Sequence, residues 1–177
     1  MIGKLKERKL SDRMKKEAVG LGLCAQWTGE WKDGSSKDEM AEKFVKGIDF
    51  CIKHNWPSVE VMKQEFGDVM HNHGIYADET LHKTDPDMMV LNGRCDASVT
   101  SKDFIVSDIY VRHTSKMRMK VRGHAYVHVS VYDDAQVEID CREDAKCFVY
   151  HYGGKVTASG KVVVRERQNT QETPQGK

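Results

Sequence analysis

The sequence lacks a long run of apolar residues and lacks the short motifs that mark common enzymes. No stretch approaches the roughly 20 apolar residues of a membrane-spanning helix, and the N-terminus is polar and charged, without the apolar core of a signal peptide. We therefore expect a soluble, intracellular protein with no membrane association. Glycine-rich phosphate loops, nucleophile elbows, zinc-finger quartets and HExxH helices are also missing. This predicts a protein that is not an enzyme, with no catalytic residues and no cofactor.

The chain also lacks an excess of charge and the cysteine pattern of a disulfide framework. Its 28 basic and 27 acidic residues leave a net charge of +1, so the whole molecule has no large field to attract nucleic acid or an anionic membrane. The five cysteines are odd in number and unclustered, and Cys141 and Cys147 fall at apolar positions of the repeat described below. We expect buried, reduced thiols that behave as small apolar side chains.

What the sequence does contain is a repeat of about ten residues between Ile105 and Tyr152. Apolar and polar residues alternate within each repeat, which is typical of half-buried strands. Pairs such as Gly123-His124 recur between the strands and indicate turns. We expect four columns of small or apolar side chains to face a core. They are Ile109, Met119, Val129, Ile139 and Val149; Val111, Val121, Val131 and Cys141; Met117, Val127, Val137 and Cys147; and Ala125, Ala135 and Ala145.

Two folds can satisfy this repeat, an antiparallel β-meander or barrel and a β-solenoid in which two repeats make one coil. Like residues at like offsets favour the solenoid, because its coils stack equivalent positions directly on one another. We predict an α+β fold in which a helical region, residues 1–87, packs on a β-solenoid of about ten-residue half-coils, residues 88–165. Residues 166–177 are polar, and we expect a disordered tail there.

The helical region should contain a helical hairpin. Ser36, followed three residues later by Glu39, forms a capping box, and apolar residues then keep to one helical face as far as His54. A second, shorter helix is expected to start at Pro57 and to stop at Gly67. The first helix of the hairpin is the strongest helix prediction in the chain.

Two features of this region leave other functions open. Residues 1–18 are rich in Lys and Arg, which suits the basic arm of a nucleic-acid-associated regulator but also a solvated terminal helix. His71 and His73 would point the same way from a strand, and with His82 they would supply ligands for a metal-dependent enzyme. The same histidines suit a plain surface loop, because no compact Cys/His quartet is present.

Polar residues on the outer surface of the solenoid also allow an acid–base set, such as His128 with Asp140, although polar residues are expected on a wet strand face in any case. Aromatic and arginine side chains are the types enriched in protein contact surfaces. The sequence places eight of them in a stripe on the outer face of the repeat, with the arginines in one column. These predicted partner-binding residues are Arg112, Arg122, Tyr126, Tyr132, Arg142, Phe148, Tyr150 and Tyr152.

This stripe has two interpretations. It is either covered by the N-terminal helices of the same chain, or it binds a protein partner or a second copy. We favour a non-enzymatic interaction or structural protein, and we consider nucleic acid an unlikely partner. A short solenoid leaves unpaired strand edges at its ends unless something covers them, so we also predict a homo-oligomer.

A resemblance rests on the run NGRCDASV…YVRH…GHAYVHVSVYDDAQVEIDCREDAKCFVYHYGGKV and on the segment Gly47-Ile48-Asp49-Phe50-Cys51. These residues resemble short β-solenoid proteins with Ala-x-Val tracts that bacteriophages and mobile elements of gut bacteria encode. The resemblance covers about the last half of the chain. It implies a binding or structural role, and a location in the cytoplasm of a bacterial host or on a virion. It brings no catalytic residues with it.

Overall fold

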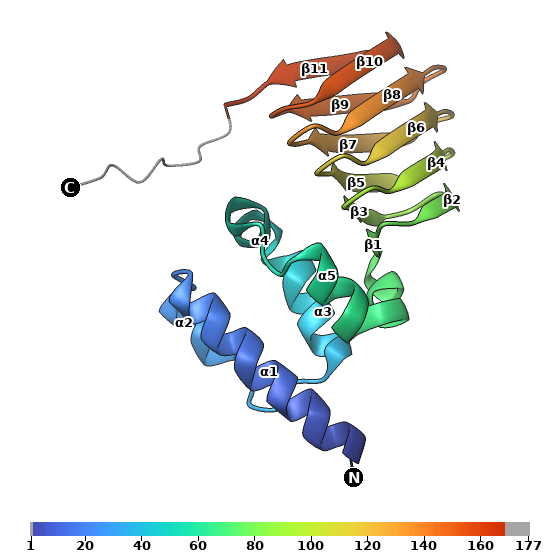
Figure 1. Ribbon diagram of the computed structural model, residues 1–177. Helices are drawn as coiled ribbons and strands as arrows, with labels where there is room; N and C mark the ends of the chain where they lie inside the picture. Colours follow the sequence, from blue (N-terminus) through green and yellow to red (C-terminus); the bar gives the residue numbers. More distant parts are fainter. Residues whose placement is uncertain (1, 169–177) are drawn as a thin grey trace, which may run out of the picture. The chain divides into compact units, whose positions relative to one another are not determined.

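The computed structural model describes residues 2–168, and these residues form two compact units that divide between His73 and Gly74. The first unit is helical and the second is a β-solenoid, whose stacked strands are seen in Figure 1. The predicted α+β fold, with helices first and a parallel β-solenoid after them, is confirmed. No helix in residues 2–168 has the length and apolar character needed to cross a bilayer.

The helical unit contains a long first helix followed by short ones. Leu10, Met14 and Ala18 of the first helix are buried, and the indole of Trp31 donates a hydrogen bond of 3.1 Å to the Ser11 hydroxyl. The helices of the unit are α1 (Ile2–Gly20), α2 (Ala25–Glu30), α3 (Lys37–Lys46), α4 (Ile48–His54), α5 (Val59–Val61), the π-helical η1 (Met62–Phe66) and the 3-10 helix η2 (Gly67–His73).

The predicted hairpin forms, but its first helix is interrupted. The capping box is present, since the Ser36 hydroxyl accepts from Glu39 N–H and the Glu39 carboxylate accepts from Ser36 N–H. The expectation of one continuous helix to His54 is wrong, because α3 ends at Lys46 and α4 begins at Ile48, with Gly47 as the cap residue between them. Glycine has a low helix propensity and leaves the backbone free to depart from helical geometry. The second helix ends at Gly67 as predicted.

The solenoid unit consists of two parallel sheets. Odd-numbered strands form one, in the order β1-β3-β5-β7-β9-β11, and even-numbered strands form the other, in the order β10-β8-β6-β4-β2; we name them the odd-strand and even-strand sheets. Every pairing between described strands is parallel, which excludes the antiparallel meander. The strands are β1 (Ile75–Ala77), β2 (Thr80–Thr84), β3 (Met88–Asn92), β4 (Asp96–Ser101), β5 (Val106–Val111), β6 (Lys116–Val121), β7 (Tyr126–Val131), β8 (Gln136–Cys141), β9 (Lys146–His151), β10 (Lys155–Gly160) and β11 (Val162–Glu166).

Each coil takes two of the ten-residue repeats. Ile109 of β5 pairs with Val129 of β7, and Val129 pairs with Val149 of β9, whereas Met119 and Ile139 pair with each other in the even-strand sheet. Consecutive repeats therefore lie in opposite sheets, and residues twenty positions apart lie one above the other. The half-coil of about ten residues is as predicted.

The solenoid starts earlier than the sequence suggested. Strands β1 and β2 lie before residue 88, in the part of the chain that was assigned to the helical region, so the boundary at residues 87 and 88 moves to 73 and 74. These strands are short, and Lys83 occupies an inward position, because it pairs with the buried Val99. The apolar column is broken at that point, and the alternation is too short to identify from sequence.

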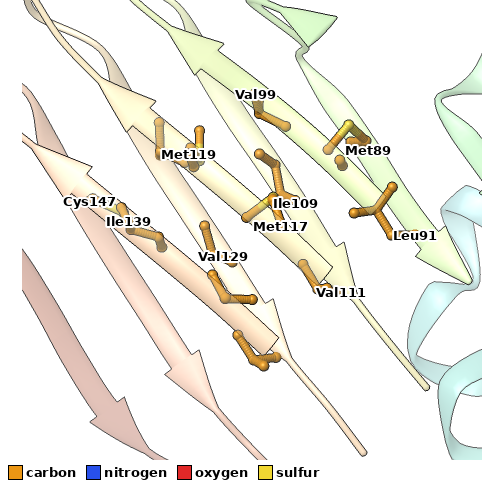
Figure 2. Packing of buried hydrophobic residues seen from close by; sticks show 14 of the residues in the cluster. Met89, Leu91, Val99, Ile109, Val111, Met117, Met119, Val129, Ile139 and Cys147 are labelled. Carbon is orange, nitrogen blue, oxygen red and sulfur yellow. The ribbon is translucent and has the colours of Figure 1, made fainter. Parts of the chain in front are cut away.

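The core lies between the two sheets and is filled by the predicted columns, as Figure 2 shows. Val129 is fully buried, and Ile109, Ile139 and Met117 are each 1% exposed. Burial of one such side chain stabilises the fold by about 1.5 to 3 kcal/mol. Cys141 and Cys147 belong to this core, and all five cysteines are free thiols, although Cys24 is exposed rather than buried.

Stacked turns connect the strands. His113, Asp133 and Glu143 adopt left-handed φ angles of 55°, 55° and 64°, and the Asp133 carboxylate accepts a hydrogen bond of 2.9 Å from His113 N–H in the coil below. Gly123 has a φ of 64°, and a Cβ there would lie 2.8 Å from the backbone nitrogen of Asp103. Aspartate and glycine recur at the bends because they tolerate left-handed φ angles, and acidic side chains there accept hydrogen bonds from backbone N–H groups of the neighbouring turn.

The last half-coils depart from the repeat. Lys155 pairs with Gln136, nineteen positions earlier, which is one residue fewer than in the regular coils. Val162 pairs with Cys147, only fifteen positions earlier, which the sequence did not predict. Strand β11 reaches Glu166, so this residue belongs to a strand and not to the expected tail, and residues 169–177 of that expected tail lie outside the described residues.

Candidate interaction surface

Four ring side chains gather on the outer face of the odd-strand sheet. Tyr126 and His128 project from β7, and Phe148 and Tyr150 project from β9, because these positions alternate with buried core residues. The ring centroids of Tyr126 and Phe148 lie 5.4 Å apart, and those of His128 and Tyr150 lie 5.9 Å apart. With Arg165 of β11, these residues form a surface that we name the aromatic face. Its rings project from strands whose alternate side chains are buried in the core.

Two arginines cover the C-terminal side of these rings. The Arg165 guanidinium lies 5.3 Å from the ring centroid of Phe148 and 5.9 Å from that of Tyr150. The Arg167 guanidinium lies 5.4 Å from the Tyr150 centroid. Exposed cation–π contacts of this kind are worth about 0.5 to 1 kcal/mol each. These contacts place the two guanidinium groups over the rings of Phe148 and Tyr150.

His128 carries a charge partner on the same sheet. Its Nδ1 lies 3.1 Å from Oδ1 of Asp108, one coil below, so these two side chains form an ion pair when the imidazole is protonated. The expected pairing of His128 with Asp140 is wrong, because Asp140 lies on the even-strand sheet. There, hydrogen bonds from Ser159 and from Arg122 lower the pKa of Asp140. His128 and Asp140 are twelve residues apart, whereas residues that stack on one another in a sheet are twenty residues apart. The two side chains therefore project from opposite sheets.

Exposed apolar side chains adjoin the aromatic face. Val106 pairs with Tyr126 in the sheet register and is 57% exposed, and Val163 pairs with Phe148 and is 47% exposed. Tyr126 itself is 37% exposed. The aromatic face is therefore part of a continuous outer surface that combines apolar, aromatic and cationic groups across β5, β7, β9 and β11.

The structure divides the eight predicted contact residues among three places. Tyr126, Phe148 and Tyr150 lie together on the aromatic face. Arg122 and Arg142 lie in the turns that follow β6 and β8, two strands of the even-strand sheet. Both bind the Asp140 carboxylate, at 2.5 Å and 2.9 Å. The predicted single column of arginines is wrong. Positions ten residues apart lie alternately in turns that follow the odd-numbered strands and in turns that follow the even-numbered strands.

The other three predicted residues occupy equivalent turns after β5, β7 and β9. Arg112 is only 2% exposed and its Nη1 donates a hydrogen bond of 3.0 Å to Asn92, and Tyr132 is 7% exposed. The prediction that Arg112 and Tyr132 lie on the outer surface is therefore wrong. Tyr132 stacks on Tyr152, with ring centroids 4.6 Å apart and planes 8° apart. This stack stabilises the turns and leaves only Tyr152 partly accessible.

The three histidines that suggested a metal site do not adopt the expected arrangement. His71 and His73 lie in η2 rather than on a strand, and His73 Nε2 lies 2.8 Å from Asp38. His82 lies on β2, in the other unit. Within residues 2–168, no group of three or more His, Cys, Asp or Glu side chains is placed to hold a metal ion.

The thiols of the core have no reactive character. Burial raises the pKa of Cys147 to about 12, and burial also raises the pKa of Cys95 and of Cys141. A thiol is a nucleophile or metal ligand only as the thiolate, which a raised pKa suppresses at neutral pH. These cysteines act as packing residues.

The basic N-terminal helix is partly engaged within its own unit. The Arg13 guanidinium lies 3.1 Å from the Glu65 carboxylate, and the Lys15 ammonium donates a hydrogen bond of 2.8 Å to the Trp31 carbonyl. Lys6, Arg8 and Lys9 are all exposed to solvent. The basic residues of α1 therefore do not all project as a free arm.

The contact residues predicted from the sequence did not include His128, Arg165 or Arg167, which the structure places at the aromatic face. A signal for His128 was present, because Asp108 lies twenty residues, or one full coil, before it. No such signal existed for the two arginines, since the shortened last half-coil alone places Arg165 beside Tyr150. No protein-family model, curated protein or solved structure shows significant similarity to the chain.

Proposed function

We propose that the protein is a non-enzymatic interaction or structural protein that binds a partner protein, or a second copy of itself, through the aromatic face. The observation that supports this most directly is the gathering of Tyr126, Phe148 and Tyr150 with Arg165 beside the exposed Val106. Tyrosine and arginine are enriched among the residues that carry most of the binding energy of protein interfaces, and phenylalanine is enriched in their composition.

The scaffold beneath the face also supports binding. Each ring projects from a strand whose alternate residues are buried, such as Val127, Val129 and Val149, all 0% exposed. Ring–ring and guanidinium–ring contacts restrict the side chains further. A partner therefore orders few side chains on contact, which reduces the entropic cost of binding.

A bacteriophage or mobile-element origin belongs to this proposal and is supported by the resemblance of the repeat region alone. Neighbouring genes that encode virion or mobility proteins would agree with it. A nucleic-acid-associated role through Lys6, Arg8 and Lys9 is the alternative, and it predicts retention on heparin that falls steeply with salt. Retention that is abolished by changing these residues would favour the alternative over the aromatic face.

Self-association is tested by the solution mass at micromolar concentration, measured by light scattering. If the partner is a second copy, the protein is an oligomer, and Tyr126→Glu with Tyr150→Glu shifts the mass towards the monomer without unfolding. The matched control is Gln136→Glu with Thr157→Glu, two exposed outward positions on the even-strand sheet. This control should leave the mass unchanged.

A different partner is tested by a photo-crosslinking amino acid at position 126 or at position 136, in the cells that produce the protein. We expect one defined protein adduct from position 126 and none from position 136, and we expect Tyr150→Glu to abolish it. A monomeric protein that gives the same adducts from both positions, or none, would contradict the proposal.

A further inference from the structure

The C-terminal end of the solenoid leaves its core open. Val164 belongs to the same inward column as Ile109, Val129 and Val149, because it pairs with Val149 in the register. Those three are 1%, 0% and 0% exposed, whereas Val164 is 41% exposed. Ala158 on β10 pairs with the buried Ile139 and is exposed as well. Each sheet therefore ends in a strand with an exposed inward side chain, Val164 in β11 and Ala158 in β10.

The backbone of β11 is open along the same edge. Among the described residues, β11 is the last strand of the odd-strand sheet and pairs with β9 on one side. Arg167 N–H donates to the His151 carbonyl at 2.9 Å. Backbone groups of a parallel strand alternate between its two sides, so the N–H and C=O groups of Val162 and Val164 face away from β9. They are placed to accept another strand.

The charge along this edge selects the kind of strand. Arg165 and Arg167 lie on the outer face, over the rings of Phe148 and Tyr150, while the Glu166 carboxylate is bound by the His151 imidazole at 2.9 Å. A strand added beside β11 would place alternate side chains next to these arginines. Carboxylates at those positions would be attracted, and ammonium groups would be repelled.

The same charges disfavour β11 of a second copy. An antiparallel pair centred on Val163 places Arg165 of each copy opposite Lys161 of the other. A pair centred on Val164 places Arg167 opposite Lys161, and a pair centred on Arg165 places that residue opposite itself. Like charges directly opposite each other destabilise a strand pair. The chain beyond Gln168 is also a poor match, because it contains no valine, leucine, isoleucine or aromatic residue.

From these observations we infer that the open edge of β11 binds an extended segment of another protein that alternates apolar and acidic residues. The backbone of the segment pairs with Val162 and Val164, its apolar side chains cover the open core, and its carboxylates meet Arg165 and Arg167. The inference rests on the proposed function, because it names the chemistry of the partner at the margin of the aromatic face. Added strands of this kind gain affinity from main-chain bonds and specificity from alternate side chains.

The test uses two fluorescent peptides of about eight residues, a typical strand length, one alternating valine with glutamate and one alternating valine with lysine. We expect the glutamate peptide to bind, as measured by fluorescence anisotropy, and the lysine peptide to bind at least about tenfold more weakly. Arg165→Glu should reverse this preference. Equal affinity for the two peptides, or no binding of the glutamate peptide, would overturn the inference.

Val164→Pro separates main-chain pairing from side-chain contact. Proline at position 164 removes the N–H group that faces the open edge, while the N–H groups of the neighbouring residues that face β9 are kept. Val164→Ala is the matched control, because it also removes the valine side chain but keeps the N–H group of residue 164. We expect Val164→Pro to lose about tenfold or more affinity for the glutamate peptide relative to Val164→Ala. Circular dichroism checks that both variants fold, and equal affinities would overturn the inference.

Other outcomes separate this inference from the proposed function. Tyr126 lies on β7, two strands from the edge, so Tyr126→Glu should still bind the glutamate peptide. A defined adduct from position 126 without peptide binding would overturn the inference alone. Peptide binding with no adduct from position 126 would count against the proposed function alone. A dimer that Val164→Pro dissociates would assign the edge to a second copy and overturn the assignment to a different protein.

Discussion

The two ends of the solenoid are built from the same repeat but differ in how they close. At the first coil, the inward residues Tyr76 and Leu81 are 6% and 8% exposed, and the Lys83 ammonium lies 5.0 Å from the centre of the Tyr76 ring. At the last coil, Val164 and Ala158 are exposed. The interior of a solenoid is fixed by its repeat, whereas each end depends on the residues that interrupt the repeat there.

The residues that interrupt the repeat differ in chemical character between the first and the last coil. At the first coil a large aromatic side chain stands in an inward column, since Tyr76 pairs with the fully buried Leu91. At the last coil the inward column of Val111 and Val131 continues into His151, which pairs with Glu166. The first coil thus ends in an aromatic side chain that covers the core, and the last coil ends in a polar pair and small side chains. This difference makes the C-terminal end the candidate for binding.

The largest expected effect is on the free energy of unfolding, when the same substitution is made in the middle and at the open end of one inward column. Val149→Asp should reduce the free energy of unfolding by about 3 kcal/mol or more, because it buries a carboxylate without a partner. Val164→Asp, in the same column, should cost less than about 1 kcal/mol, because the carboxylate stays hydrated. Urea denaturation measures both. Similar losses for the two variants would show that the last coil is closed.

The next effect concerns the aromatic side chain at the first coil. Tyr76→Ala should cost about 2 to 4 kcal/mol, because it removes a large buried ring. Val162→Ala at the last coil should cost about 1 kcal/mol or less, because Val162 is only partly buried. Thermal and urea unfolding of the two variants provide the comparison. A smaller loss for Tyr76→Ala than for Val162→Ala would contradict it.

A smaller effect concerns the polar pair that ends the last coil. The hydrogen bond with Glu166 raises the pKa of His151 in the folded state, so this pair stabilises β11 fully below the unfolded pKa of about 6.5. The stabilisation is lost as the pH rises through the raised folded pKa. Glu166 is largely exposed, so the effect should stay below about 1 kcal/mol.

Amide hydrogen exchange of Val163 and Arg165, whose N–H groups face β9, measures this effect. After correction for the intrinsic pH dependence, their protection should fall between slightly acidic and slightly alkaline pH. Glu166→Gln is the control and should abolish the step. A step that persists in this variant would mean that His151 does not hold the strand in this way.

The smallest expected effect is a shift of the melting temperature, and it serves as a baseline for the comparisons at both ends of the solenoid. Deletion of residues 1–9 should shift the melting temperature by no more than about 2 °C, because Leu5, Lys6 and Lys9 are exposed. Leu10 is the first buried apolar residue among the side chains of α1 that the structure describes. Differential scanning fluorimetry measures the shift. A large fall would show that this arm is a structural part of the fold.

The interior of the solenoid could be predicted because its residues repeat at a constant spacing. Val129 and Ile139 were placed in the core by alternation alone, and both are buried. The first coil was missed because β1 and β2 are short and Lys83 stands where the pattern requires an apolar residue. The break of the first hairpin helix at Gly47 was missed because glycine lowers helix propensity without excluding a helix.

The candidate site was predicted only in part, for a geometric reason. Tyr126, Phe148 and Tyr150 were identified as contact residues by their type, and they do lie together. Arg112 and Arg122 were placed in one column because they are ten residues apart, yet a coil of twenty residues puts them on opposite edges. Residue type and alternation were sufficient to predict that a side chain points outward from its strand, but not to predict to which of the two sheets that strand belongs.

The sequence by itself determined which side chains face the core and where the chain turns, because both follow from the local alternation of apolar residues and from residues that tolerate left-handed φ angles. Only the tertiary structure decided which outward residues meet. The coil of twenty residues brings Asp108 to His128, and the shortened last half-coil brings Arg165 to Tyr150. These contacts join residues through the stacking of coils, and stacking depends on the length of every turn between them.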